Sequence, residues 1–245
     1  MLSSSQIKHI RSLQQGKFRK ELGLFIAEGP KIVGELPGSF IRVEAVYGLK
    51  PWVEENASRF EFIKARVYEI SQKELDRISG MTTPNQVLAV CHVPDRDTSE
   101  IYSEDGILLV LDGIRDPGNL GTIIRTADWF GINNILCSED CVESFNPKVV
   151  QASMGSISRV KVFSARLEDF LQGLEQEIYA TVMNGESVFD ANPGQGVYLI
   201  GNEANGIRPE VLQYATKNIS IPAGGGAESL NAAVAAGIIL ALATR

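Results

Sequence analysis

Three stretches of this sequence place glycine beside side chains that can bind or orient a substrate. They are residues 112–131 (DGIRDPGNLGTIIRTADWFG), 199–210 (LIGNEANGIRPE) and 221–231 (IPAGGGAESLN). Because glycine has no side chain, a ligand can come within hydrogen-bonding distance of the main chain at these points. Each stretch alone is weak evidence, since Asn-Gly is a common turn pair and Ser or Asn often caps a helix. Three of them together indicate one ligand site.

Polar side chains are dense in the first stretch. Pro117, Gly118 and Gly121 are expected to form a tight turn, and the following helix is expected to carry Arg125 in its first turns. Carboxylate, amide and guanidinium groups gather here, on Asp112, Arg115, Asp116, Asn119 and Arg125. The alternative is an ordinary turn between a strand and a helix with an exposed arginine.

The glycines of the third stretch do not match a phosphate-binding motif. The pattern GxxxxGK[ST] is absent, and GxGxxG would need glycine at Ser229. The main-chain amides between Gly224 and Ala227 are therefore offered to a ligand other than a pyrophosphate. Ser229 and Asn231 add a hydroxyl and an amide to this loop, although capping of the next helix is an alternative role for them.

All three stretches follow segments with the pattern of buried parallel strands. The apolar runs of residues 106–245 are GILLVLDGI, NNILCSE, SRVKVF, IYATVM, GVYLIGN and NISIP, and helical patterns lie between most of them. Continuous apolar strands alternating with helices predict a parallel α/β sheet covered on both faces. Ligands of such sheets bind at the carboxyl ends of the strands, where the three stretches lie.

Residues 1–95 predict a smaller α/β domain. Residues 5–15 have apolar side chains at helical spacing, and strands are expected at LFIAEG, VEAVYG, RVYEIS and QVLAVCHV. Ser71 and Glu74 have the spacing of a capping box. The polar segment 94–106 lacks periodicity, so we place a linker at 96–105 between domains 1–95 and 106–245.

The composition excludes several classes of protein. No apolar run reaches the roughly 18 residues that cross a bilayer, and the N-terminus lacks the apolar core of a signal peptide, so no membrane partner is expected and the expected location is cytoplasmic. Three cysteines without a CxxC pair and two distant histidines argue against a disulfide framework, a metal site and a Ser-His-Asp triad. The cysteines are expected to be buried or half-buried thiols.

The charge is unevenly distributed along the chain. Residues 1–95 hold 13 Lys and Arg against 11 Asp and Glu, whereas residues 96–245 hold 10 against 19. The first 20 residues contain no acidic side chain and carry five basic ones, Lys8, Arg11, Lys17, Arg19 and Lys20. This asymmetry indicates a nucleic-acid-binding N-terminal part, with a solvated basic helix as the alternative.

The order and spacing of the three stretches resemble the motifs of the SpoU/TrmH family of RNA ribose methyltransferases in the SPOUT superfamily. The resembling segments are DPGNLGTIIRTADWFG, LIGNEANG and ISIPAGGGAESLNAAVAAGI. Near the N-terminus, IKHIRSLQQGKFRKELGLFIAEGPKIV and SGMTTPNQVLAV resemble the family's substrate-binding domain less specifically. One departure is Gln86, where many members have glycine before VLAV.

The resemblance implies an α/β trefoil knot for residues 106–245 and S-adenosyl-L-methionine as the cofactor. The cofactor is expected to bind in a bent conformation between the second and third stretches. The residues implied to contact it are Leu199, Ile200, Gly201, Ile219, Ile221, Pro222, Gly225, Ser229 and Leu230.

The implied reaction is methyl transfer to a ribose 2′-hydroxyl without a metal. Arg125 is implied to activate or orient the hydroxyl, Asn119 to position RNA or Arg125, and Glu203 to hold the polar network. Ser229 and Asn231 are implied to brace the nucleotide and the knot. The N-terminal basic residues and Arg115 are the expected RNA contacts. The family also implies a homodimer through the knot domain, with Arg125 near the partner's site.

Two other functions remain open at this level. The same chemistry could act on tRNA, although the separate N-terminal domain favours ribosomal RNA. A non-catalytic RNA-binding knot protein is the other, and the presence of Asn119, Arg125, Glu203, Ser229 and Asn231 argues against it. A nucleotide-dependent oxidoreductase lacks the dinucleotide fingerprint.

Overall fold

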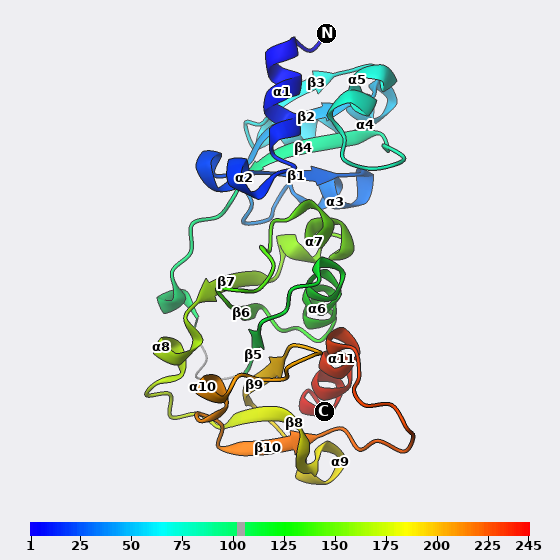
Figure 1. Ribbon diagram of the computed structural model, residues 1–245. Coiled ribbons are helices and arrows are strands. Elements are labelled where there is room, and N and C mark those ends of the chain that lie inside the picture. Colours follow the sequence, from blue (N-terminus) through cyan, green and yellow to red (C-terminus); the bar gives the residue numbers. More distant parts are fainter. Residues whose placement is uncertain (102–105) are drawn as a thin grey trace. The chain divides into compact units, whose positions relative to one another are not determined.

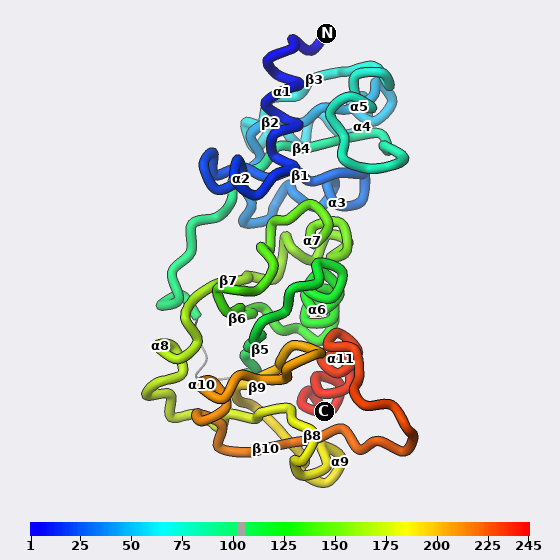
Figure 2. The backbone as a smooth tube through the Cα atoms, viewed as in Figure 1, coloured from blue at the N-terminus to red at the C-terminus, as the bar shows by residue number. Residues whose placement is uncertain are grey.

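A computed structural model describes residues 1–101 and 106–245. The chain forms two compact units, residues 1–95 with 143–159, and residues 96–142 with 160–245. Figures 1 and 2 trace the elements of each unit along the chain. Residues 102–105, which belong to the predicted linker, lie outside the described residues.

The first unit contains a four-stranded sheet in the order β1-β4-β2-β3. Its elements from residues 1–95 are α1 (Ser4–Ser12), α2 (Gly16–Leu22), β1 (Leu24–Glu28), α3 (Pro30–Glu35), β2 (Val43–Gly48), α4 (Lys50–Phe62), β3 (Arg66–Glu69), α5 (Gln72–Ile78) and β4 (Val87–His92). Strand β4 is antiparallel to β1 and β2, whereas β2 and β3 are parallel and are joined through α4. All four predicted strands and the capping box of α5 are confirmed.

The helix predicted over residues 5–15 is present as α1 but ends three residues early, and a second helix, α2, follows it. Helix α1 ends at Ser12, and Gln15 takes an extended conformation (φ −101°, ψ 131°) before α2 begins. Ile7, Ile10 and Leu13 are buried as expected. The break keeps Leu13 in the core while α2 turns Arg19 inward, where it is 3% exposed.

A segment from later in the chain completes the first unit. Residues 143–159 contain α7 (Pro147–Ala152) and the short 3-10 helix η2 (Ser156–Ser158), and α7 packs against β1. The ring centroids of Phe145 and Phe25 are 4.5 Å apart. Arg19 donates two hydrogen bonds to the carboxylate of Glu143, at 3.0 and 2.7 Å. This inserted segment therefore shares a core with residues that precede it by more than one hundred positions.

The second unit contains a six-stranded sheet in the order β10-β8-β9-β5-β6-β7, and every neighbouring pair is parallel. Its elements are η1 (Thr98–Glu100), β5 (Ile107–Asp112), α6 (Pro117–Trp129), β6 (Asn134–Ser138), β7 (Lys161–Ala165), α8 (Leu167–Leu171), β8 (Ile178–Ser187), α9 (Val188–Ala191), β9 (Gly196–Gly201), α10 (Pro209–Leu212), β10 (Lys217–Ser220) and α11 (Ala232–Ala243). The predicted parallel α/β sheet and its six strands are confirmed.

The register of this sheet brings the sequence stretches to one edge. Asp112 at the end of β5 pairs with Gly201 at the end of β9, so the first two stretches leave the sheet side by side. The third stretch follows β10, and Figure 2 shows this loop extending outward before it returns to α11. Helix α11 packs against α6.

The start of α6 differs from the expected tight turn. The helix begins at Pro117, so Gly118 and Gly121 are already helical and Arg125 lies in its third turn. Proline suits the first helical position because its missing N–H has no partner there in any helix. The Asp116 side chain caps the helix by accepting a hydrogen bond from the Asn119 amide at 2.8 Å.

No helix in the described residues is long and apolar enough to cross a membrane. The same residues contain no group of three or more His, Cys, Asp and Glu side chains placed to hold a metal ion.

Candidate functional site

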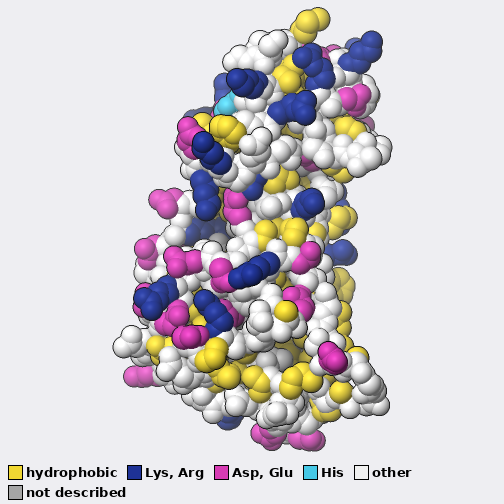
Figure 3. Space-filling view, viewed as in Figure 1, with side chains coloured by type: hydrophobic (Ala, Val, Ile, Leu, Met, Phe, Trp, Pro, Cys, Tyr) yellow, Lys and Arg dark blue, Asp and Glu magenta, His cyan; other side chains and the backbone are white. Residues whose placement is uncertain are grey.

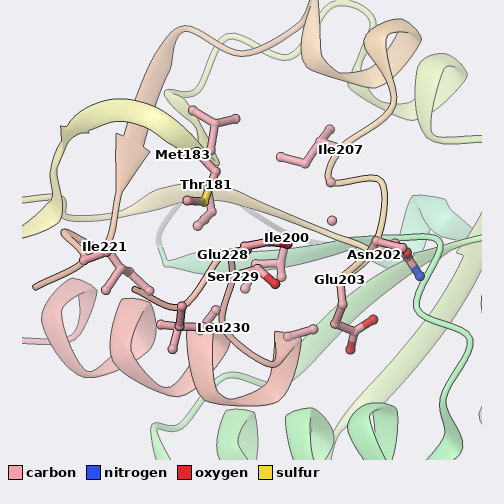
Figure 4. A pocket seen from close by; sticks show the side chains of 18 of the residues that line it. Thr181, Met183, Ile200, Asn202, Glu203, Ile207, Ile221, Glu228, Ser229 and Leu230 are labelled. Atoms are coloured by element: carbon pink, nitrogen blue, oxygen red, sulfur yellow. Dashed lines mark hydrogen bonds between the residues drawn. The ribbon is translucent and has the colours of Figure 1, made fainter. Parts of the chain in front are cut away.

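The loop after β9 and the loop 221–231 enclose a cavity of about 740 Å³. Pockets for small organic ligands commonly measure roughly 300–1,000 Å³. Figure 4 shows Met183 and Ile207 across the cavity from Leu230, with Ile200 and Ile221 also in its lining. These apolar side chains form walls suited to the faces of a flat ring.

The third stretch offers its main chain to this cavity. Gly224 and Gly225 line it, and a Cβ added to either would meet no atom within 4 Å. Neither glycine has a positive φ. Their value is therefore the bare backbone facing the cavity and not a conformation that other residues avoid.

Gly201 is needed for a different reason than close approach of a ligand. A Cβ at this position would lie 2.2 Å from the carbonyl carbon of Gly206. Asn202 and Gly206 exchange two main-chain hydrogen bonds, of 3.1 and 2.8 Å, and Gly206 has a φ of 67°. The loop folds back on itself so tightly that only glycine fits at its base, although Gly201 also lines the cavity.

Three predicted polar residues form a chain of hydrogen bonds beside the cavity. The Asn119 amide donates to the carboxylate of Glu203, and its oxygen accepts from the Asn231 amide at 2.9 Å. The oxygen of Asn231 in turn accepts from the main-chain N–H groups of Ala233 and Val234, capping α11. The first turns of α6 and α11 are thereby tied to the loop after β9.

An ion pair between the partly exposed Arg208 and a buried carboxylate, which the sequence analysis did not identify, also holds this loop. Arg208 follows the loop directly and binds Asp112, which is 1% exposed. The side chain of Asn202 donates to the carbonyl of Gly113 at 2.9 Å. The loop is therefore attached at both ends to the end of β5, through Asp112 and Gly113. An arginine directly after the loop that follows β9 was the only sequence signal for this ion pair. Its partner lies 96 residues earlier in the sequence, and the order of the strands in the sheet brings the two together.

Most of the residues expected to contact the cofactor line the cavity. They are Ile200, Gly201, Ile221, Pro222, Gly225, Ser229 and Leu230. Leu199 and Ile219 are the exceptions, because both are fully buried strand residues outside the lining. Successive side chains of a strand point to opposite faces, so Leu199 packs into the core while Ile200 reaches the cavity. Thr181, Val182 and Met183 of β8 also line the cavity and were missed.

Arg125 does not line the cavity. Its side chain is exposed, and no hydrogen bond or ion pair to it is seen in the part of the chain that the structure describes. Arg125 follows Asn119 by six positions, which places the two side chains about 120° apart around α6 at 100° per residue. A single chain therefore does not bring Arg125 together with Asn119, Glu203 and Asn231.

Four of the five N-terminal basic candidates are exposed. Lys8 and Arg11 are three residues apart on α1, and Lys17 and Lys20 are three apart on α2, so each pair shares a helix face. Figure 3 shows several Lys and Arg side chains on the visible face of the N-terminal unit.

Arg19 corrects the expectation. Its guanidinium is buried, binds Glu143, and donates to the carbonyl of Leu13 at 2.9 Å, so its donors are committed inside the unit and unavailable to RNA. Arg115, in the other unit, is 72% exposed and pairs with Asp140 at 3.1 Å.

The cysteines are free thiols, with Cys91 and Cys137 buried and Cys141 half-buried. Burial raises the pKa of Cys91. A hydrogen bond from Cys137, with further hydrogen bonds from Ser138 and the Ile114 N–H, lowers the pKa of Cys141 to about 7 against the opposing effect of burial.

Comparison with known proteins places these features in a family. A family model described as SpoU rRNA Methylase matches residues 106–241, and an MRM3-like substrate binding domain matches residues 4–89. The 23S rRNA (guanosine(2553)-2'-O)-methyltransferase RlmP of Bacillus subtilis is 28% identical over 97% of this chain and 95% of its own length.

Two solved structures resemble the whole chain. A structure titled as a putative RNA methyltransferase of the TrmH family from Porphyromonas gingivalis has a TM-score of 0.88 and 37% identity, covering 98% of this chain and 97% of its own. An AdoMet-bound rRNA methyltransferase from Sinorhizobium meliloti has a TM-score of 0.88 and 31% identity, covering 98% and 95%.

Proposed function

We propose, since the chain belongs to the SpoU rRNA Methylase family, that it transfers a methyl group from S-adenosyl-L-methionine to a ribose 2′-hydroxyl of ribosomal RNA. The observation that carries this function is the cavity between the β9 loop and residues 221–231, with the Glu203–Asn119–Asn231 hydrogen-bond chain beside it. Ribosomal RNA is favoured over tRNA because the relative from Bacillus subtilis and that from Sinorhizobium meliloti are both named as acting on rRNA.

The residues of the cavity fit an adenosine-based cofactor. Apolar side chains at Ile200, Ile221 and Leu230 suit the faces of an adenine ring, and the bare main chain at Gly224 and Gly225 supplies donors and acceptors for its edge. When bound, S-adenosyl-L-methionine supplies an electrophilic methyl group on a sulfonium sulfur. The loop after β9 must keep its shape for this fit, which is the role we assign to Gly201 and to the Arg208–Asp112 pair.

Arg125 is proposed to act on the RNA and not on the cofactor. The ribose oxygen attacks the methyl carbon, the carbon–sulfur bond breaks, and the hydroxyl proton passes to water, because a guanidinium stays protonated at any ordinary pH and cannot accept it. Arg125 therefore orients the ribose and a neighbouring phosphate through its planar fork of donors. Asn119 and Glu203 hold the polar edge of the site, and Ser229 contacts the nucleotide from the loop 221–231.

A homodimer through residues 106–245 is proposed to complete the site. Its support is the position of Arg125, which is exposed and away from the cavity of its own chain. In the dimer, Arg125 of one copy serves the cavity of the other. Within the same residues we propose the trefoil knot that the family resemblance implies, and the cytoplasm as the location where the protein meets RNA.

A complementation experiment tests the shared site. Arg125→Ala should inactivate the enzyme by removing the group that orients the ribose, and Gly225→Val should do so by filling the cavity. Mixing the two variants and allowing subunits to exchange restores part of the methyl transfer if each site uses two chains. No recovery in mixed dimers, with subunit exchange verified by differently tagged copies, would contradict the shared site.

RNA contacts are proposed at Lys8, Arg11, Lys17 and Lys20 of the N-terminal unit and, separately, at Arg115 of the other unit. Contacts to phosphate release counterions, so each lost contact lowers the dependence of RNA affinity on salt by about one unit of slope. Changing the four lysine and arginine residues of α1 and α2 to glutamine should weaken RNA binding and flatten this slope. Changing Lys50 and Lys73, which lie elsewhere on the same unit, serves as the control.

The target is tested with RNA that lacks the modification. Ribosomal RNA and tRNA from a strain without this protein are incubated with the enzyme and methyl-labelled cofactor, and the labelled nucleotide is mapped by its resistance to alkaline cleavage. Label in ribosomal RNA supports the proposal. Label in tRNA alone would favour the alternative target, and label in neither, despite RNA binding, would favour a non-catalytic RNA-binding protein.

A further inference from the structure

The cavity is lined by two carboxylates and by no basic side chain. Glu203 and Glu228 are its only charged lining residues within the part of the chain that the structure describes, and no Lys, Arg or His stands among the others. Figure 4 shows Glu203 on the loop after β9 and Glu228 beside Ser229 on the loop 221–231. The formal charge of the cavity lining is therefore negative.

The two carboxylates differ in how they are held. Glu203 accepts a hydrogen bond from Asn119, which fixes its position in the polar chain. Glu228 is exposed, and no hydrogen bond or ion pair to it is seen among the described residues. Its charge is therefore free to act on whatever occupies the cavity.

The ligand changes its charge during the proposed reaction. S-adenosyl-L-methionine carries a positive sulfonium, whereas the product left after methyl transfer, S-adenosylhomocysteine, has a neutral thioether in the same place. The two molecules otherwise have nearly the same shape, so apolar walls and main-chain hydrogen bonds bind both alike. A negative lining distinguishes them by charge.

We propose that Glu228 makes this cavity select the methyl-bearing sulfonium over the spent thioether, an inference that rests on the proposed function of the site. The selection favours release of product and reloading with fresh cofactor. Because Glu228 is exposed to solvent, the effect is that of a screened charge pair, about two- to fivefold in relative affinity.

Calorimetric titration of the full-length protein tests this with three ligands. They are S-adenosyl-L-methionine, S-adenosylhomocysteine, and sinefungin, in which an amine replaces the sulfonium. The wild-type protein should bind both cations more tightly than the thioether. Glu228→Gln should weaken the two cations by about two- to fivefold and leave the thioether unchanged. Raising the salt concentration from about 0.05 to about 0.5 M should also reduce the preference of the wild-type protein for the two cationic ligands over the thioether.

The matched control is Glu210→Gln. Glu210 is an exposed glutamate on α10 outside the lining, so this change removes the same charge from the unit without altering the cavity. Its ligand preference should equal that of the wild type. An equal shift in both variants would assign the effect to the net charge of the protein and overturn the role of Glu228.

The remaining outcomes distinguish failure of charge selection by Glu228 from failure of the proposed methyltransferase function. Equal affinity of wild type and Glu228→Gln for each ligand, or loss of all three ligands together in the variant, would refute charge selection while leaving a cofactor site in place. Failure of the wild-type protein to bind any of the three would instead refute the proposed function itself.

Discussion

The guanidinium of Arg208 and the buried carboxylate of Asp112 join the end of β5 to the loop after β9. The Nε atom of Arg208 donates to Oδ1 of Asp112 at 2.7 Å, and the main-chain N–H of the same arginine donates to Oδ2 at 2.7 Å. The hydrogen bonds with Asp112 raise the pKa of Arg208. Both oxygens of the Asp112 carboxylate thus hold the loop after β9, which lines the cavity.

Removing the arginine should destabilise the protein. Arg208→Ala leaves Asp112 buried without its cation, and we expect the free energy of unfolding to fall by about 2–3 kcal/mol, less than for a fully buried pair because Arg208 is partly exposed. Urea denaturation measures this. The control is Arg115→Ala, which breaks the exposed pair with Asp140 and should cost no more than about 1 kcal/mol. Equal losses would mean that burial of Asp112 does not matter.

Two glycines should respond differently to substitution by alanine. Gly201→Ala forces a Cβ to within 2.2 Å of the Gly206 main chain, so the loop must shift and cofactor binding should weaken by at least tenfold. Gly225→Ala adds the same methyl group into open space and should leave the fold and the melting temperature unchanged. Calorimetry with the cofactor and thermal unfolding measure both. Retained affinity in Gly201→Ala would show that this loop does not shape the cofactor site.

Replacing Asn119 by alanine should harm the enzyme less than replacing it by a negatively charged aspartate. Asn119→Ala removes one link from the chain between Glu203 and Asn231, whereas Asn119→Asp places a second carboxylate against Glu203. Like charges in contact repel, and the donor to Glu203 is lost as well. We expect methyl transfer to fall more in the aspartate variant than in the alanine variant. Lowering the pH should reduce this difference, because protonation removes the repulsion between the two carboxylates. Similar activity of the two variants across pH would argue against this contact.

Arg125 should be needed for transfer and not for cofactor binding. Arg125→Ala should keep cofactor affinity within a few-fold and lose about 100-fold or more in methyl transfer, the scale expected when the attacking group is no longer held in position. Arg125→Lys keeps the charge but not the planar fork, so it should rescue little. Single-turnover rates and calorimetry separate the two effects. A fully active alanine variant would remove the mechanism proposed for the ribose hydroxyl.

Cys141 should be the reactive thiol of the folded protein. Its pKa is lowered to about 7, and a thiol reacts as its thiolate, so the rate of alkylation should rise about tenfold per pH unit below 7 and level off above it. Cys91 and Cys137 are buried with raised pKa values and should react only after unfolding. Mass spectrometry after iodoacetamide treatment at several pH values measures this. Faster modification of Cys91 than of Cys141 would contradict it.

The strands and the loops that matter were predictable because their signals are local. A buried parallel strand is a short continuous apolar run, as in GILLVLDGI, and its length and flanking glycines distinguish it from the longer helices. The position of the three glycine-containing stretches at strand ends follows from the same pattern. Even the capping box of Ser71 and Glu74 requires only four consecutive residues.

Only the tertiary structure decided which of these residues meet. Asn119 contacts Glu203 and Asn231, Arg208 finds Asp112, and residues 143–159 join the first unit, because sheet order and domain packing bring distant segments together. Arg19 shows the limit most clearly. Its sequence neighbours make it one of five exposed basic residues, yet a helix break at Gln15 and the inserted Glu143 bury it in an ion pair. The physical reason is that charge and periodicity act over a few residues, whereas burial depends on what the whole chain packs against each side chain.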